Sequence, residues 1–99
     1  MFRLTVQDVF VIKNRGLVAT GRVELGQIAV GDEVRINGNR AVHVDAIESF
    51  RKKLDEAAEG GANVGLLFFS GLGRSDLSPG DVLTAGAVEP TSGGVDVSL

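Results

Sequence analysis

Short apolar or alternating segments, separated by glycine, proline and asparagine, recur along the chain and constrain its fold more than any other feature. Residues 33–36 show the pattern clearly, because apolar and polar side chains alternate with the period of a β strand. We expect Val34 and Ile36 to face a core and their polar neighbours to face water. The pair Asn37-Gly38 follows directly and is a strong hairpin signal. The pattern predicts an all-β domain.

Six strands are predicted from these segments. Their expected ranges are 2–12, 17–25, 33–36, 42–50, 62–70 and 82–84. Residues 50–59 are ambiguous, because their apolar positions have helical spacing and Gly60-Gly61 follows as a typical helix stop. Taken alone, this segment is typical of a short helix.

The composition limits the kind of protein and site. A chain of 99 residues fits one domain and can bury a core without disulfides. The sequence has no cysteine and one histidine, which excludes thiol chemistry and the usual zinc sites, so we expect no metal and no cofactor. No apolar run is long enough for a membrane helix, so we expect no membrane partner and a cytoplasmic location.

The net charge of −3 argues against tight non-specific binding to nucleic acid. The charges are unevenly distributed, however. Residues 1–53 carry nine Lys/Arg and six Asp/Glu, whereas residues 54–99 carry one and seven. Opposite patches on one small domain and two ordinary solvated faces are both compatible with this asymmetry.

The sequence does not favour an enzyme. His43 alternates with apolar neighbours, which predicts an exposed side chain, and nothing like a nucleophile elbow accompanies it. The segment Gly71-Leu72-Gly73 lacks the third glycine of a dinucleotide loop. Carboxylates such as Asp32 and Asp81 fall in predicted turns, where they accept backbone hydrogen bonds.

The run from Gly16 to Val34 resembles the second, β-barrel domain of elongation factor Tu and related translational GTPases, as do 6–10, 50–52, 54–57, 61–65 and 80–83. The resemblance covers about four-fifths of the chain. It implies a single six-stranded antiparallel β-barrel over residues 1–87 and a flexible tail over 88–99. For the ambiguous segment it implies a strand through residues 50 and 51 and then a compact loop over 54–57. No G-x-x-x-x-G-K-[ST] phosphate loop is present, so we expect no GTPase activity of this chain's own.

In that family the domain helps to hold the aminoacylated 3′ end of tRNA, and the resemblance implies a corresponding site here. The residues that would surround the aminoacyl group are Gln7, Asp8, Phe10, Thr20, Phe50 and Asn63. Those that would contact the terminal adenine are Ile12, Val18, Glu48, Arg51 and Leu67. Apolar surface, hydrogen-bonding groups and a guanidinium are what a base and its phosphate require.

A purely structural interpretation competes with this one. In it, Ile12, Val18 and Leu67 are core residues, Phe10 and Phe50 close the ends of the barrel, and Asn63 tightens a turn. Gln7 also replaces an acidic residue of the family, and Ser70-Gly71 stands where the family has Arg-Gly.

Two functions follow from the resemblance. The first is a binding module for an aminoacyl-tRNA acceptor end or another RNA end, acting beside a separate translational GTPase or the ribosome. The alternative is a protein-interaction barrel that docks a GTPase or another protein. The oligomeric state is open, because an edge strand or the segment 95–99 could pair with a second copy.

Overall fold

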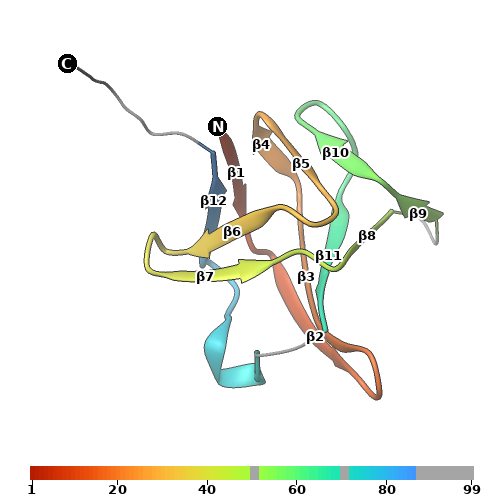
Figure 1. Ribbon diagram of the computed structural model, residues 1–99, viewed down its shortest axis with the longest axis vertical. Helices are drawn as coiled ribbons and strands as arrows, with labels where there is room; N and C mark the ends of the chain where they lie inside the picture. Colours follow the sequence, from red (N-terminus) through yellow and green to blue (C-terminus); the bar gives the residue numbers. More distant parts are fainter. Residues whose placement is uncertain (50–51, 70–71, 87–99) are drawn as a thin grey trace.

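The computed structural model describes residues 1–49, 52–69 and 72–86 and is built almost entirely of short strands (Figure 1). The strands of this part of the chain are β1 (Phe2–Thr5), β2 (Asp8–Ile12), β3 (Gly16–Gly21), β4 (Val23–Leu25), β5 (Gln27–Ala29), β6 (Glu33–Ile36), β7 (Arg40–His43), β8 (Ala46–Ser49), β9 (Lys52–Leu54), β10 (Glu56–Ala58), β11 (Val64–Phe68) and β12 (Val82–Ala85). A 3₁₀ turn, η1 (Arg74–Asp76), precedes β12. The predicted all-β class is confirmed.

The strands form three open sheets, so the prediction of a single closed six-stranded barrel is wrong. Two five-stranded sheets have the orders β4-β1-β12-β6-β7 and β2-β3-β11-β8-β9, and β10 pairs with β5 in a small third sheet. The strand pairings among the described residues are antiparallel, as predicted.

The predicted long strands bend and divide between the two large sheets. Residues 2–12 split because the hydrogen-bond partner changes in the middle: Val6 donates its N–H to the carbonyl of Asp81, whereas Gln7 donates to the carbonyl of Thr20. Residues 17–25 split in the same way into β3 and β4. Strands that pass from one sheet to another at a bend make the corners of such packings.

Gly21 lies at the second of these corners. A Cβ at this position would be 2.6 Å from the carbonyl oxygen of Thr5. Only glycine therefore lets the end of β3 come this close to the end of β1.

The core lies between the sheets. Leu4, Val34 and Leu83 enter it from the first sheet, and Ala19 and Leu66 enter it from the second. These side chains are fully buried. Val34 and Ile36 are both buried, as the alternation in residues 33–36 predicts.

The ambiguous segment forms neither a helix nor a compact loop in its described part. Residues 52–58 form β9 and β10, which belong to different sheets. β10 pairs with β5, a strand that the sequence pattern did not predict. Residues 50 and 51 lie outside the described part of the chain, and so do residues 87–99, where the tail was predicted.

Turn chemistry agrees with the sequence. Asp32 accepts a hydrogen bond from the N–H of Ala29, and Asp81 accepts one from the N–H of Ser78. Asn37 adopts a positive φ of 51° in the β6–β7 hairpin, next to Gly38 at 77°. These turns are the ones that the sequence predicts.

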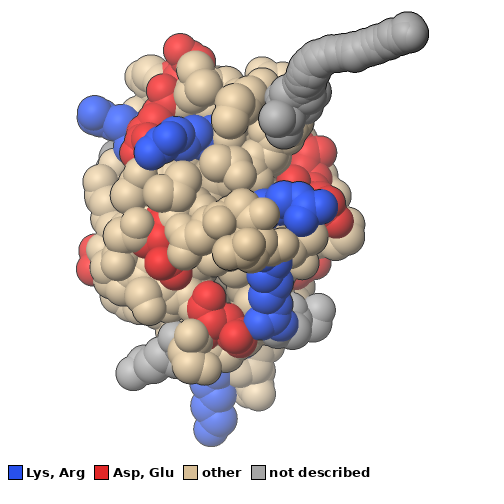
Figure 2. Space-filling view, turned by 90° about the vertical axis from the view of Figure 1, so that its left-hand side faces the viewer, with Lys and Arg blue, Asp and Glu red and all other residues tan. Residues whose placement is uncertain are grey.

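Charged side chains of both signs are mixed on the face that carries the β6–β7 hairpin (Figure 2). Arg40 of β7 and Asp76 of η1 illustrate this, since they form an ion pair at 2.8 Å. This face therefore presents no large field of one sign.

Candidate functional site

Seven of the residues singled out in the sequence lie on one face of the sheet β2-β3-β11-β8-β9, on the side away from the core. They are Asp8, Phe10, Ile12, Val18, Thr20, Glu48 and Leu67. We call this surface the outer face. Its members come together through register, because residues directly opposite each other on paired strands point to the same side.

Two rows of cross-strand neighbours define the outer face. In one row, Phe10 is opposite Val18, and Val18 is opposite Leu67. In the other, Asp8 is opposite Thr20, Thr20 is opposite Gly65, and Gly65 is opposite Glu48. The intervening residues of these strands, such as Ala19 and Leu66, point into the core.

The apolar members of the outer face are buried in two cases and exposed in two. Val18 and Leu67 are buried, but they do not belong to the core cluster between the sheets. Phe10 is 52% exposed and Ile12 is 37% exposed. The structural interpretation therefore agrees with the burial of Val18 and Leu67, whereas it is wrong for Ile12, and Phe10 is half exposed; the exposed apolar groups of the face lie at its β2 edge.

Gln7 and Asn63 close one end of the outer face. Nδ2 of Asn63 donates a hydrogen bond to Oε1 of Gln7 at 2.8 Å, and the carbonyl of Asn63 accepts one from the Ser49 hydroxyl at 3.0 Å. The pair thus joins the β1–β2 link to the start of β11. A glutamine at position 7 suits this contact because its amide oxygen is a neutral acceptor.

Hydrogen-bonding groups lie along the row that starts at Asp8. The Thr20 hydroxyl donates to the carbonyl of Asp8 at 3.4 Å. Among the described residues the Asp8 carboxylate has no hydrogen-bond or ion-pair partner. This exposed carboxylate is therefore available to a ligand.

Glu48 is held by Arg15, which the sequence interpretation did not include. Nη2 of Arg15 lies 3.1 Å from Oε2 of Glu48, so the cation from the β2–β3 turn reaches across to β8. Lys53 of β9 is opposite Glu48 in the register. Both side chains of the ion pair are partly exposed, and a carboxylate has further acceptor capacity beyond one such pair.

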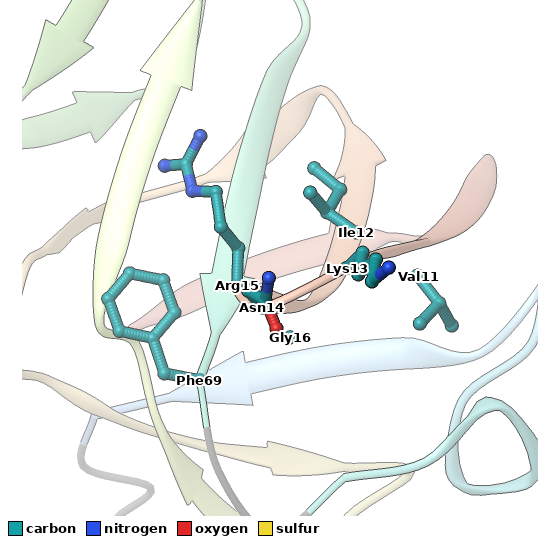
Figure 3. Close-up of a pocket in the computed structure, with 7 residues that line it drawn as sticks. All are labelled: Val11, Ile12, Lys13, Asn14, Arg15, Gly16 and Phe69. Carbon is teal, nitrogen blue, oxygen red and sulfur yellow. The ribbon is translucent and has the colours of Figure 1, made fainter.

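A hollow of about 670 Å³ adjoins the outer face at the β2–β3 hairpin (Figure 3). Its lining consists of residues 11–16 and Phe69, which is 51% exposed. Figure 3 shows Arg15 and the Phe69 ring on one side of the hairpin and Val11 on the other. Of the described residues, Lys13 and Arg15 line the hollow and no carboxylate does.

Some predicted site residues cannot be placed. Phe50 and Arg51 lie outside the described residues, and so does the Ser70-Gly71 pair. Conversely, the sequence interpretation missed Arg15, which pairs with Glu48, and Lys53, which is opposite Glu48 in the register.

Comparison with known families agrees with this architecture. The model of elongation factor Tu domain 2 matches residues 16–84. The chain belongs to the elongation factor Tu domain 2 family. The match includes the β3, β8 and β11 parts of the outer face. The β2 side of the face, with Asp8, Phe10 and Ile12, precedes the matched residues.

The elongation factor Tu domain 2 family is a family of translation factor domains, which places the chain in the context of the translational machinery. In the described residues, no three or more His, Cys, Asp or Glu side chains are grouped so that they could hold a metal ion. A helix long and apolar enough to cross a membrane is also absent from this part of the chain.

Proposed function

We propose that the outer face binds the 3′ end of an RNA, with an aminoacylated acceptor end as the ligand that its groups suit best. The observation that carries the proposal is the register, which gathers aromatic, aliphatic, hydroxyl and carboxylate side chains on one side of one sheet. Membership of the elongation factor Tu domain 2 family supports a translational ligand.

Each group has a chemical role in this proposal. The exposed ring of Phe10, opposite Val18 in the register, offers a surface for a base. The exposed carboxylate of Asp8 attracts an α-ammonium group. Arg15 lies beside Glu48 and provides a cation for a phosphate. One open face desolvates its ligand only partly, so we expect micromolar to millimolar affinity.

An NMR titration of the ¹⁵N-labelled protein tests the proposal. The ligand is a short aminoacylated RNA ending in CCA, and the uncharged RNA is the control. We expect saturable shifts at Phe10, Thr20 and Asn63 that are larger with the aminoacylated form. If no localised shifts appear at millimolar RNA, the proposal is refuted.

A pair of matched variants sharpens the test. Phe10→Ala removes an exposed apolar group from the outer face, and Leu25→Ala removes one of similar exposure (45%) from β4 in the other large sheet. We expect weaker RNA binding for Phe10→Ala alone. Equal binding by both variants contradicts the assignment of the outer face.

The hollow at the hairpin favours a second candidate function, the docking of a protein. Exposed apolar side chains gather there, namely those of Val11, Ile12 and Phe69, and the neighbouring cations Lys13 and Arg15 favour an acidic partner. Val11→Ser discriminates the two candidates, because Val11 lies off the outer face. Loss of a protein partner without any change in RNA binding supports docking.

A further inference from the structure

Strand β2 lies at the edge of its sheet and differs from the other edge strands in how that edge is protected. The two large sheets end in β4, β7, β2 and β9. β4 has three residues and pairs with β1 through a register shift. β9 also has three residues and carries Lys52 and Lys53, and β7 carries Arg40. Short length, charge and irregular pairing all keep edge strands from pairing with another chain.

These protections do not apply to β2 beyond its first residue, Asp8. The strand is five residues long and pairs with β3 over its whole length without a register shift. Residues 9–12 are all apolar, and none of them carries a charge. Among the described residues, no strand pairs with β2 on the side away from β3. β2 is therefore open to pairing with a strand of another chain.

The end of β2 exposes apolar side chains on both faces of the sheet. Phe10 and Ile12 are exposed on the outer face, and Val11, which points to the opposite face, is 51% exposed. η1 lies near β2 without covering these three residues, and the tip of the β2–β3 hairpin is at the lower right of the molecule (Figure 1). A ligand on the outer face would leave Val11 exposed. A strand added at the edge contacts all three, because it presents side chains to both faces.

We propose that two copies of this chain pair through β2, edge to edge and antiparallel, so that the sheet continues across a two-fold axis. The inference goes beyond the proposed function and does not depend on it. A strand that suits this edge is apolar on both faces and uncharged in its middle, and β2 itself meets that requirement. Such an isologous contact covers the edges of both copies at once, so the assembly ends at the dimer.

The two-fold axis of this dimer is expected at Val11. In that register the two Val11 side chains are opposite each other on one face, and Phe10 is opposite the partner's Ile12 on the other. Asp8 at the start of each strand then comes near the partner's hairpin, which carries Lys13, so opposite charges meet at each end of the contact. An axis at Phe10 would instead place the Asp8 carboxylate opposite an apolar Ile12 side chain.

Sedimentation equilibrium of the full chain tests the proposal. One strand pair buries less than a standard interface, so we expect a weak dimer with a dissociation constant between about 10 μM and 1 mM. Val11→Lys places two like charges opposite each other at the axis, and we expect it to weaken the dimer at least about tenfold. Val30→Lys is the matched control, because Val30 is 44% exposed and lies in the turn after β5. We expect Val30→Lys to leave the dissociation constant unchanged.

A mixture of two charged variants tests the position of the axis. Val11→Lys and Val11→Glu bring opposite charges together only in the mixed dimer, so we expect the mixture to associate more strongly than either variant alone. A mixture that associates no more strongly than its components overturns the pairing at Val11. A wild-type chain that is monomeric at about 1 mM, or a dimer that Val11→Lys leaves intact, overturns the proposal. A dimer that Val97→Lys weakens as much as Val11→Lys does also overturns it, because residues 95–99 are then the second strand.

Discussion

Asn37 connects the β6–β7 hairpin to the start of β12, and its replacement tests how a turn residue stabilises this fold. Its Nδ2 donates to Oδ1 of Asp81 at 3.1 Å, and its Oδ1 accepts from the N–H of Val82 at 2.9 Å. Its backbone N–H also donates to the carbonyl of Val82 at 2.7 Å. The side chain therefore makes two bonds to a segment about 45 residues away in the sequence.

Two variants divide the effect into its parts. Asn37→Gly removes the two side-chain bonds and keeps the positive φ accessible, and at ~0.5–1.5 kcal/mol for each bond we expect a loss of about 1–3 kcal/mol. Asn37→Ala loses the same bonds and leaves in the left-handed region a residue that tolerates it less well than asparagine or glycine, which adds about 1 kcal/mol. The expected loss for Asn37→Ala is therefore about 2–4 kcal/mol.

Urea unfolding followed by circular dichroism measures these losses, and thermal melting checks them at roughly 4–8 °C per kcal/mol. Asn39→Ala is the matched control, because the side chain of Asn39 makes no hydrogen bond to the described residues and its φ is not positive. Wild-type stability of Asn37→Gly would refute the role of the side-chain bonds. A glycine variant less stable than the alanine variant would refute the role of φ.

Three further predictions concern the core, a corner and pH. Leu66 is fully buried in β11, and we expect Leu66→Ala to lower the free energy of unfolding by about 2–5 kcal/mol. Urea titration measures this loss, with Leu25→Ala at an exposed position as the control. A smaller loss for Leu66→Ala than for Leu25→Ala would contradict the assignment of Leu66 to the core. Gly21→Ala is expected to lower the melting temperature by more than about 10 °C, because its Cβ would be 2.6 Å from the carbonyl oxygen of Thr5, and a melting temperature equal to that of the wild type would disprove the close approach. Hydrogen bonding by Thr5, aided by Arg3, lowers the pKa of Glu24 below its ordinary value of 4.5, so the stabilisation is present above that value and is lost as the pH falls through the lowered pKa. The melting temperatures of the wild type and Glu24→Gln should therefore converge as the pH falls below 4.5, and a constant difference across this range would exclude the contribution of Glu24.

Local features of the fold were predictable because they depend on neighbouring residues. The alternation in residues 33–36 correctly placed Val34 and Ile36 in the core. The pair Asn37-Gly38 marked a hairpin, because both residues tolerate positive φ. Asp32 and Asp81 were assigned to turns by the ability of a short carboxylate to accept a nearby N–H.

The division into sheets was not predictable from such patterns. Residues 2–12 read as one strand, yet Val6 and Gln7 bond to segments about 75 and 13 residues away in the sequence, which lie in different sheets. The helical spacing of residues 50–59 was likewise overridden in the described part by pairing of Ala57 with Ile28. Non-local hydrogen bonds and core burial decide such cases against local propensity.

The candidate site divides in the same way. The sequence by itself supplied the chemical types of its residues, through their resemblance to a family, and local alternation supplied the side of each strand. The tertiary structure alone decided that Phe10, Val18 and Leu67 form one row and that Arg15 reaches Glu48 across 33 residues of sequence. The physical reason is that register between strands is set by the packing of the whole core, and no short segment contains that information.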